Sequence, residues 1–163
     1  MKLRKNLLVT LFIALLSIAI VGCASNESEA NTDPNQVTDI VWEWETLKVA
    51  TGEVDEGGRS MREETAIPNP ENYTLILRED GTFSGKADCN EISGTYSTES
   101  GYSFTMGAST MAFCGEESLD QQYIDLLSRV VAGGPDGAGG FALETPGGSE
   151  RMEFRNGGVA PAN

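Results

Sequence analysis

The sequence predicts an α+β fold: a mainly antiparallel, partly open (cracked) β-barrel with one packed α-helix at about 118–132. Two observations predict it. Short runs of alternating apolar and polar residues recur between turn signals, which is typical of antiparallel strands. A single stretch instead has apolar residues at spacings of three and four, which is typical of an amphipathic helix. Because an antiparallel sheet must hide its edges, a curled sheet with the helix against it is the simplest arrangement.

The strands are expected where alternation is clearest. Near the start of the domain, Ile40, Trp42 and Trp44 occupy alternate positions, which places their side chains on one face of a strand. The strongest hairpin signal is Asp80-Gly81, a turn dipeptide between two alternating runs. Paired strands are therefore expected at 73–78 with 82–86, 92–96 with 102–106, and 141–144 with 151–154.

Two stretches are expected to lack strands. Residues 51–72 are rich in Gly, Glu, Asp, Asn and Pro, and this composition predicts a long surface loop. Residues 133–140 are unusually rich in glycine and are also expected to form a loop.

The helix is expected to begin at Ser118. Ser118 followed by Gln121 matches a capping box, and Asp120 suits the positive end of the helix dipole. Gly133-Gly134-Pro135 is expected to stop the helix. The apolar stripe of the helix consists of Leu119, Tyr123, Leu126, Leu127, Val130 and Val131.

The N-terminus has the three parts of a secretory signal peptide, expected at 1–22. Three basic residues precede the segment Leu7–Val21, which is almost entirely apolar. Because the residue after the expected cleavage point is Cys23, the segment resembles a bacterial lipoprotein signal, in which this thiol receives the lipid. The alternative is a transmembrane anchor, but the apolar segment is shorter than the roughly 20 residues that span a bilayer.

The rest of the chain divides into three parts. Residues 23–36, which begin with the lipidated Cys23, hold no large apolar residue and are expected to form a disordered tether. Residues 37–156 are expected to form one domain, and 157–163 a flexible tail. The domain is thus expected outside the cytoplasm, in the bacterial cell envelope, attached to a membrane by the lipid on Cys23.

The chain is strongly acidic, with a formal net charge of −14. Cleavage of the signal peptide would remove three of the 11 basic residues and none of the 25 acidic ones, which changes the charge to −17. Such a chain repels nucleic acid, so no nucleic-acid partner is expected. It favours cationic partners, although solubility is the simpler explanation for the acidity.

Lipidation of Cys23 leaves Cys89 and Cys114 as the remaining cysteines. In an oxidising compartment such a pair is expected to form one disulfide. The alternative is a pair of buried free thiols.

The sequence contains no histidine, which excludes a Ser-His-Asp or Cys-His catalytic group and any metal site that depends on imidazole. No catalytic residue, metal site or cofactor is therefore expected, and the protein is predicted not to be an enzyme. Trp42 and Trp44 are expected in the core, as aromatic residues on strands usually are. Alternatively, they lie at an open seam of the barrel and hold an apolar ligand.

Three blocks of sequence occur in close succession: Ala-Asp-Cys-Asn at 87–90, Ser-Gly-Thr-Tyr at 93–96 and Ser-Thr-Met-Ala-Phe-Cys at 109–114. With the acidic helix start that follows, they resemble the META-domain family, which includes HslJ and many small bacterial lipoproteins. The resemblance covers about 38–155. It implies a small cracked barrel with a helix across it, but no activity, because the molecular function of the family is poorly defined.

The leading hypothesis is a non-enzymatic, stress-related cell-envelope lipoprotein whose META domain binds or scaffolds another envelope component. One alternative is an acidic inhibitor or decoy of a cationic protein such as lysozyme, attracted to it by charge. The other is a carrier of a small apolar ligand inside the barrel.

Overall fold

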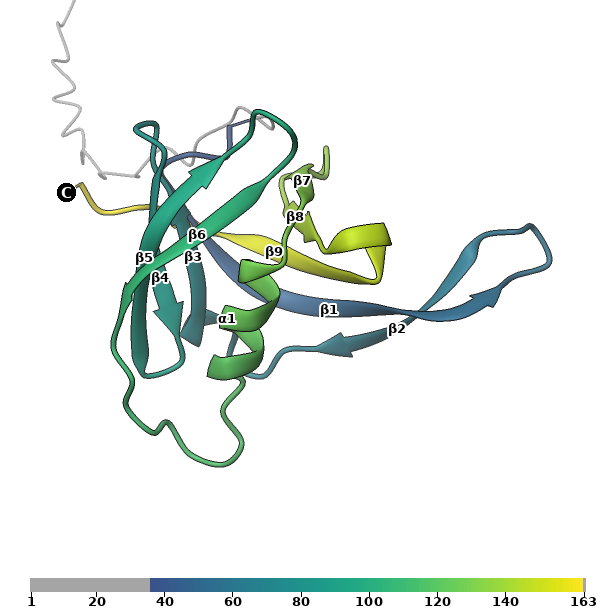
Figure 1. Cartoon of the computed structure of the whole chain (residues 1–163), viewed down its shortest axis with the longest axis horizontal. Helices are drawn as coiled ribbons and strands as arrows, with labels where there is room; N and C mark the ends of the chain where they lie inside the picture. Colours follow the sequence, from purple (N-terminus) through teal and green to yellow (C-terminus); the bar gives the residue numbers. More distant parts are fainter. Residues whose placement is uncertain (1–35, 163) are drawn as a thin grey trace, which may run out of the picture.

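The computed structural model describes residues 36–162, which form one antiparallel sheet with one α-helix against it (Figure 1). The strand order is β6-β5-β4-β3-β1-β9-β8-β7. The remaining strand, β2, stands outside this order and pairs with the C-terminal half of β1. The helix α1 spans Asp120–Ser128, and two short 3-10 helices span Pro70–Asn72 and Pro146–Gly148. The strands are β1 (Ile40–Val54), β2 (Ser60–Ala66), β3 (Tyr73–Leu77), β4 (Thr82–Ala87), β5 (Asn90–Ser97), β6 (Ser103–Ser109), β7 (Ala132–Pro135), β8 (Phe141–Glu144) and β9 (Glu150–Val159).

The sheet curls strongly into a half-barrel, and α1 lies against its inner side (Figure 1). The strands β6 and β7 stand at the two ends of the strand order, so hydrogen bonds do not close the barrel within the described chain. At this seam the β5–β6 turn packs directly on the chain that enters β7, since a side chain at Gly101 would clash with the carbonyl oxygen of Val131. The predicted fold class is confirmed.

Aromatic side chains from the sheet and the helix fill the inside of the curl. Trp44 stacks on Tyr123 of α1 with a centroid distance of 5.3 Å, and Trp42 packs on Phe141 at 5.2 Å. Both tryptophans are almost fully buried. They lie in the core and not at an open seam, so the alternative role as holders of an apolar ligand loses its basis.

The helix is shorter than the expected 118–132. Its apolar spacing continues to Val130, which is buried, but the backbone has already left the helix at Arg129 to enter β7. The expected capping box is not formed. The hydroxyl of Ser118 instead accepts a hydrogen bond from the Asp120 amide, and the Asp120 carboxylate accepts one from the Gln121 amide.

The prediction of a loop at 51–72 is wrong over most of this range. The strand β1 continues far past the barrel and pairs with β2 (Figure 1). Together they form a projecting hairpin, residues 48–66, that we call the arm. Every residue of β2 is exposed. Because neither face of β2 is buried, its sequence has no apolar alternation, which is the signal that reveals most strands.

Two further boundaries differ from expectation. Part of the glycine-rich stretch forms β7, where Gly133 allows close pairing because a Cβ there would clash with the carbonyl oxygen of Ala142. The strand β9 runs past position 156 to Val159, into the expected tail at 157–163. The amide of Ala160 then donates to the carbonyl oxygen of Asp39 at 2.9 Å, so the chain enters and leaves the barrel at the same end.

The expected signal peptide at 1–22, the lipidation site Cys23 and all of the expected tether except Gln36 lie outside the described residues. Among residues 36–162, no helix is long and apolar enough to cross a membrane.

Candidate binding groove on the outer face of the sheet

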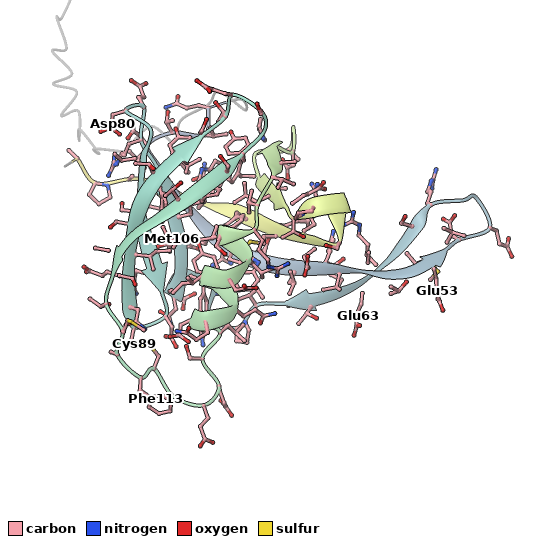
Figure 2. The ribbon with its side chains drawn as sticks, viewed as in Figure 1. Glu53, Glu63, Asp80, Cys89, Met106 and Phe113 are labelled. Atoms are coloured by element: carbon pink, nitrogen blue, oxygen red, sulfur yellow. A yellow bond between two sulfur atoms is a disulfide. The ribbon has the colours of Figure 1, made fainter. Side chains whose placement is uncertain are left out.

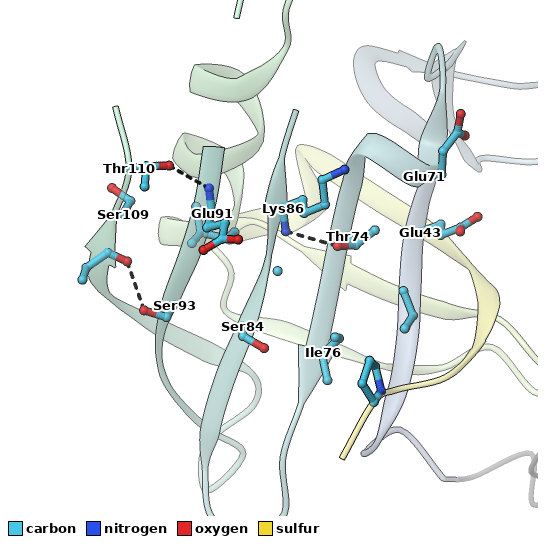
Figure 3. Close-up of a pocket in the computed structure, with 15 residues that line it drawn as sticks. Glu43, Glu71, Thr74, Ile76, Ser84, Lys86, Glu91, Ser93, Ser109 and Thr110 are labelled. Carbon is cyan, nitrogen blue, oxygen red and sulfur yellow. Dashed lines mark hydrogen bonds between the residues drawn. The ribbon is translucent and has the colours of Figure 1, made fainter. Parts of the chain in front are cut away.

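An open groove of about 750 Å³ crosses the outer face of β1, β3, β4, β5 and β6 (Figure 3). On these strands the aromatic side chains point inward, and the alternate, outward positions carry a mixture of hydroxyl, charged and aliphatic side chains. The groove is lined by Val41, Glu43, Glu71, Thr74, Ile76, Ser84, Gly85, Lys86, Glu91, Ile92, Ser93, Ala108, Ser109, Thr110 and Pro161.

The middle of the groove is low because its side chains are small and held close to the sheet. The hydroxyl of Thr74 accepts a hydrogen bond from the Lys86 amide at 3.1 Å, and the hydroxyl of Ser93 donates to the carbonyl oxygen of Ala108 at 3.0 Å (Figure 3). At Gly85 any side chain would clash with the carbonyl oxygen of Thr74. The short side chains of Thr74 and Ser93 thus stay close to the sheet and leave a shallow channel above them.

The rim of the groove is charged, with three carboxylates from Glu43, Glu71 and Glu91 and one ammonium group from Lys86 (Figure 3). The guanidinium group of Arg155, on β9, donates a hydrogen bond to the Glu43 carboxylate at 2.8 Å. This hydrogen bond raises the pKa of Arg155. Glu71 and Glu91 are exposed and have no salt-bridge partner within residues 36–162. Their carboxylates are thus free to accept hydrogen bonds from a cationic ligand.

The chemistry of the groove suits binding. Its carboxylates and hydroxyls offer hydrogen bonds, and Val41 and Ile76 supply apolar surface. Across the described part of the chain, no three or more Cys, Asp or Glu side chains gather in a way that would hold a metal ion.

The second feature of interest is a disulfide at the lower end of the barrel, as viewed in Figure 2. It joins Cys89, in the β4–β5 turn, to Cys114, in the loop before α1, with the two Cα atoms 5.6 Å apart. Disulfides of this kind are typical of proteins outside the cytoplasm. The adjacent Asn90 side chain is buried and binds both polar backbone atoms of Ala112, at 2.7 and 3.0 Å.

The residues that the sequence indicated do not meet at one site. Trp42 and Trp44 lie in the core, and the disulfide of Cys89 and Cys114 lies beyond one end of the groove. The groove was not predicted from the sequence. The one signal that could have found it is the row of small hydroxyl residues at the outward positions of neighbouring strands, such as Thr74, Ser84 and Ser93.

Known proteins resemble this chain in sequence pattern and in fold. No curated protein matches it significantly. A crystal structure of a DUF4847 family protein from Bacteroides vulgatus has a similar fold, with a TM-score of 0.50 at 12% sequence identity. The similarity covers 73% of this chain and 93% of that one, and it concerns the fold alone. The family model of the META domain matches residues 36–154, which include all three of the sequence blocks at 87–114. The chain therefore belongs to the META-domain family.

Proposed function

We propose that this protein is a non-enzymatic lipoprotein of the bacterial cell envelope that binds another envelope component through the outer groove. The lipid on Cys23 would hold the domain at a membrane, as the lipoprotein-like signal indicates. The disulfide of Cys89 and Cys114 supports a position outside the cytoplasm. The observation that carries the binding role is the groove itself, an open channel with hydrogen-bonding edges on the face opposite the packed core.

The ligand that fits this groove best is an extended, basic polypeptide segment. A shallow channel across several strands suits an elongated ligand better than a compact one, because little of a compact ligand would be covered. Glu71 and Glu91 stand at the rim without a salt bridge among the described residues, and the whole sequence is acidic. Lysine or arginine side chains of the ligand would supply the missing positive charge.

The binding role is tested by photo-crosslinking in cells that produce the full-length protein. A photoreactive residue is placed at Ser84, which is in the groove, or at Glu53, which is on the arm (Figures 2 and 3). We expect a discrete adduct from position 84 and none from position 53. The adduct should be lost in the charge-reversed variant Glu71→Lys/Glu91→Lys. Adducts of similar pattern from both positions would contradict the proposal.

The anchor is tested separately by feeding radiolabelled palmitate to the same cells. The label should enter the natural protein and not the Cys23→Ser variant. A natural protein without label, found with an uncleaved N-terminus in the cytosol, would overturn the assignment to the envelope.

A further inference from the structure

Two large apolar side chains are almost fully exposed on one loop, and one of them, Phe113, lies at the lower end of the barrel as viewed in Figure 2. Met111 and Phe113, in the loop between β6 and α1, are 87% and 84% exposed. Both lie beside the disulfide that joins this loop to Cys89. Single exposed apolar residues are common, but two large apolar side chains that are almost fully exposed two positions apart on one loop are typical of an interaction site.

This exposure does not arise from a loose loop. The backbone is fixed at every second residue. The Thr110 amide donates a hydrogen bond to the carbonyl oxygen of Glu91 at 3.0 Å, and the backbone of Ala112 is bound by the side-chain amide of Asn90. Cys114 is held by the disulfide. Fixing these alternate positions leaves Met111 and Phe113 between them, with their side chains outward. A rigid loop loses little conformational entropy when it binds, so the pair is already arranged for contact.

Acidic groups line a hollow formed by the C-terminal part of the same loop. This hollow of about 370 Å³ is lined by Asp88, Glu116 and Glu117, among other residues. None of these three carboxylates has a salt-bridge partner within the described chain. The hollow is therefore suited to an arginine or lysine side chain from another molecule.

We propose that the segment Thr110–Leu119, which we call the docking loop, is the binding surface for a cationic protein. Met111 and Phe113 enter an apolar pocket of that protein, and one of its basic side chains enters the carboxylate-lined hollow. Large flexible and aromatic side chains such as these are enriched in the centres of protein interfaces. Apart from Thr110, this loop shares no lining residue with the outer groove, and the proposal holds whether or not the groove binds a ligand.

A lipid surface is the less suitable occupant. Insertion of Met111 and Phe113 would bring Glu116 and Glu117 against the headgroups, and an anionic membrane repels carboxylates. The same carboxylates attract a basic protein surface. Charge thus favours the protein partner over the membrane.

The test uses the full-length secreted chain with Cys23→Ser, which separates docking from the lipid anchor. The probe is a fluorescent amphipathic helical peptide of leucine and lysine, about 18 residues or five helical turns long. The control probe has glutamate in place of lysine. Fluorescence anisotropy gives the Kd for each variant, and circular dichroism confirms that each variant is folded.

We expect Met111→Ser/Phe113→Ser to weaken binding of the lysine peptide by roughly tenfold, as loss of a central apolar contact does. Glu116→Gln/Glu117→Gln should weaken it by roughly threefold, and added salt should reduce the difference. The matched control is Val54→Ser/Met61→Ser on the arm, whose side chains are 64% and 46% exposed, and it should bind as the parent does.

Three results would overturn the proposal. One is equal affinity for the parent and for Met111→Ser/Phe113→Ser, which would make the attraction a general effect of net charge. A second is equal affinity for the lysine and glutamate peptides. The third is binding of the parent to vesicles of phosphatidylcholine and phosphatidylglycerol that is lost in Met111→Ser/Phe113→Ser, which would assign the loop to membranes.

Discussion

The docking loop and the arm both project from the barrel, but they are held in different ways. The docking loop is joined to the β4–β5 turn by a disulfide and by the buried side chain of Asn90. The arm is a two-stranded hairpin that is exposed on both faces, and it is braced only near its base, where Lys48 pairs with Glu64 and Glu153. An isolated hairpin is marginally stable in water. Exposed apolar residues on a fixed backbone, as in the docking loop, are therefore better arranged for binding than those on the arm.

Removal of the disulfide should have the largest effect. The variant Cys89→Ser/Cys114→Ser frees two residues that are 25 positions apart, and the free energy of unfolding should fall by about 3 kcal/mol. Urea denaturation of the variant and of the parent measures this loss. The parent under reducing conditions serves as the control and should match the variant. A loss below about 1 kcal/mol would mean that the other contacts fix the loop unaided.

The Asn90→Ala substitution should rank second. It removes the hydrogen bonds to both backbone atoms of Ala112 and one to the buried carboxylate of Asp120 at 3.1 Å. We expect a loss of about 2 kcal/mol in the free energy of unfolding, together with faster hydrogen exchange at the Ala112 amide. Gln122→Ala, at an exposed position of α1, is the control and should cost less than about 0.5 kcal/mol. Unchanged exchange at Ala112 in Asn90→Ala would contradict this view of the loop.

The base of the arm should show a dependence on pH through Glu150, which pairs with Val49 in the sheet. Hydrogen bonds from Thr145 and Ser149, and then from Arg129, hold the pKa of Glu150 below its ordinary value of 4.5. A carboxyl whose pKa is lower in the folded state stabilises the fold above the unfolded pKa. This stabilisation is lost as the pH falls through the folded pKa.

Glu150→Gln should therefore lower the unfolding free energy at pH 7 by up to about 1 kcal/mol, and the difference from the parent should shrink below pH 4.5. Thermal unfolding between pH 7 and pH 3 measures it. Glu63→Gln, at an exposed position of the arm, is the control and should follow the parent at every pH. A constant difference between Glu150→Gln and the parent across this range would contradict the role of the ionised carboxylate.

Shortening of the arm should have the smallest effect. Replacement of residues 51–61 by Asn-Gly joins Ala50 to Arg62, which already face each other in the hairpin, through a two-residue turn. We expect the unfolding free energy to change by no more than about 0.5 kcal/mol, because the removed side chains are exposed. A loss of several kcal/mol would show that the arm supports the barrel.

The sequence allowed a good prediction of the parts of the fold that separate a buried face from an exposed one. In β3 and β4, inward residues such as Leu75 and Phe83 alternate with outward ones, and Gly81 takes the positive φ of 81° that the Asp-Gly turn requires. Burial creates the alternation, so the strands that line the core were visible in advance. The family blocks at 87–114 were visible as well.

The remaining features leave no such local trace. The strand β2 has no buried face, so its composition is that of a loop. The predicted end of α1 lies beyond its observed end. Val130 follows the apolar spacing of the helix, but it is buried by the turn that leads into β7. The outer groove is assembled from single small residues on several strands, and only the register between those strands brings Thr74, Ser84 and Ser93 onto one surface.

The position of β1 between β3 and β9 bears on how the domain would withstand a pull from the proposed lipid anchor. Tension on the chain ahead of Asp39 acts along β1, while a partner held on the docking loop resists from the opposite pole. The hydrogen bonds on both sides of β1 lie across this direction, so they would be sheared together and not unzipped one by one. With the proposed anchor at one end and the proposed partner at the other, this geometry would let the barrel carry force between them without unzipping β1.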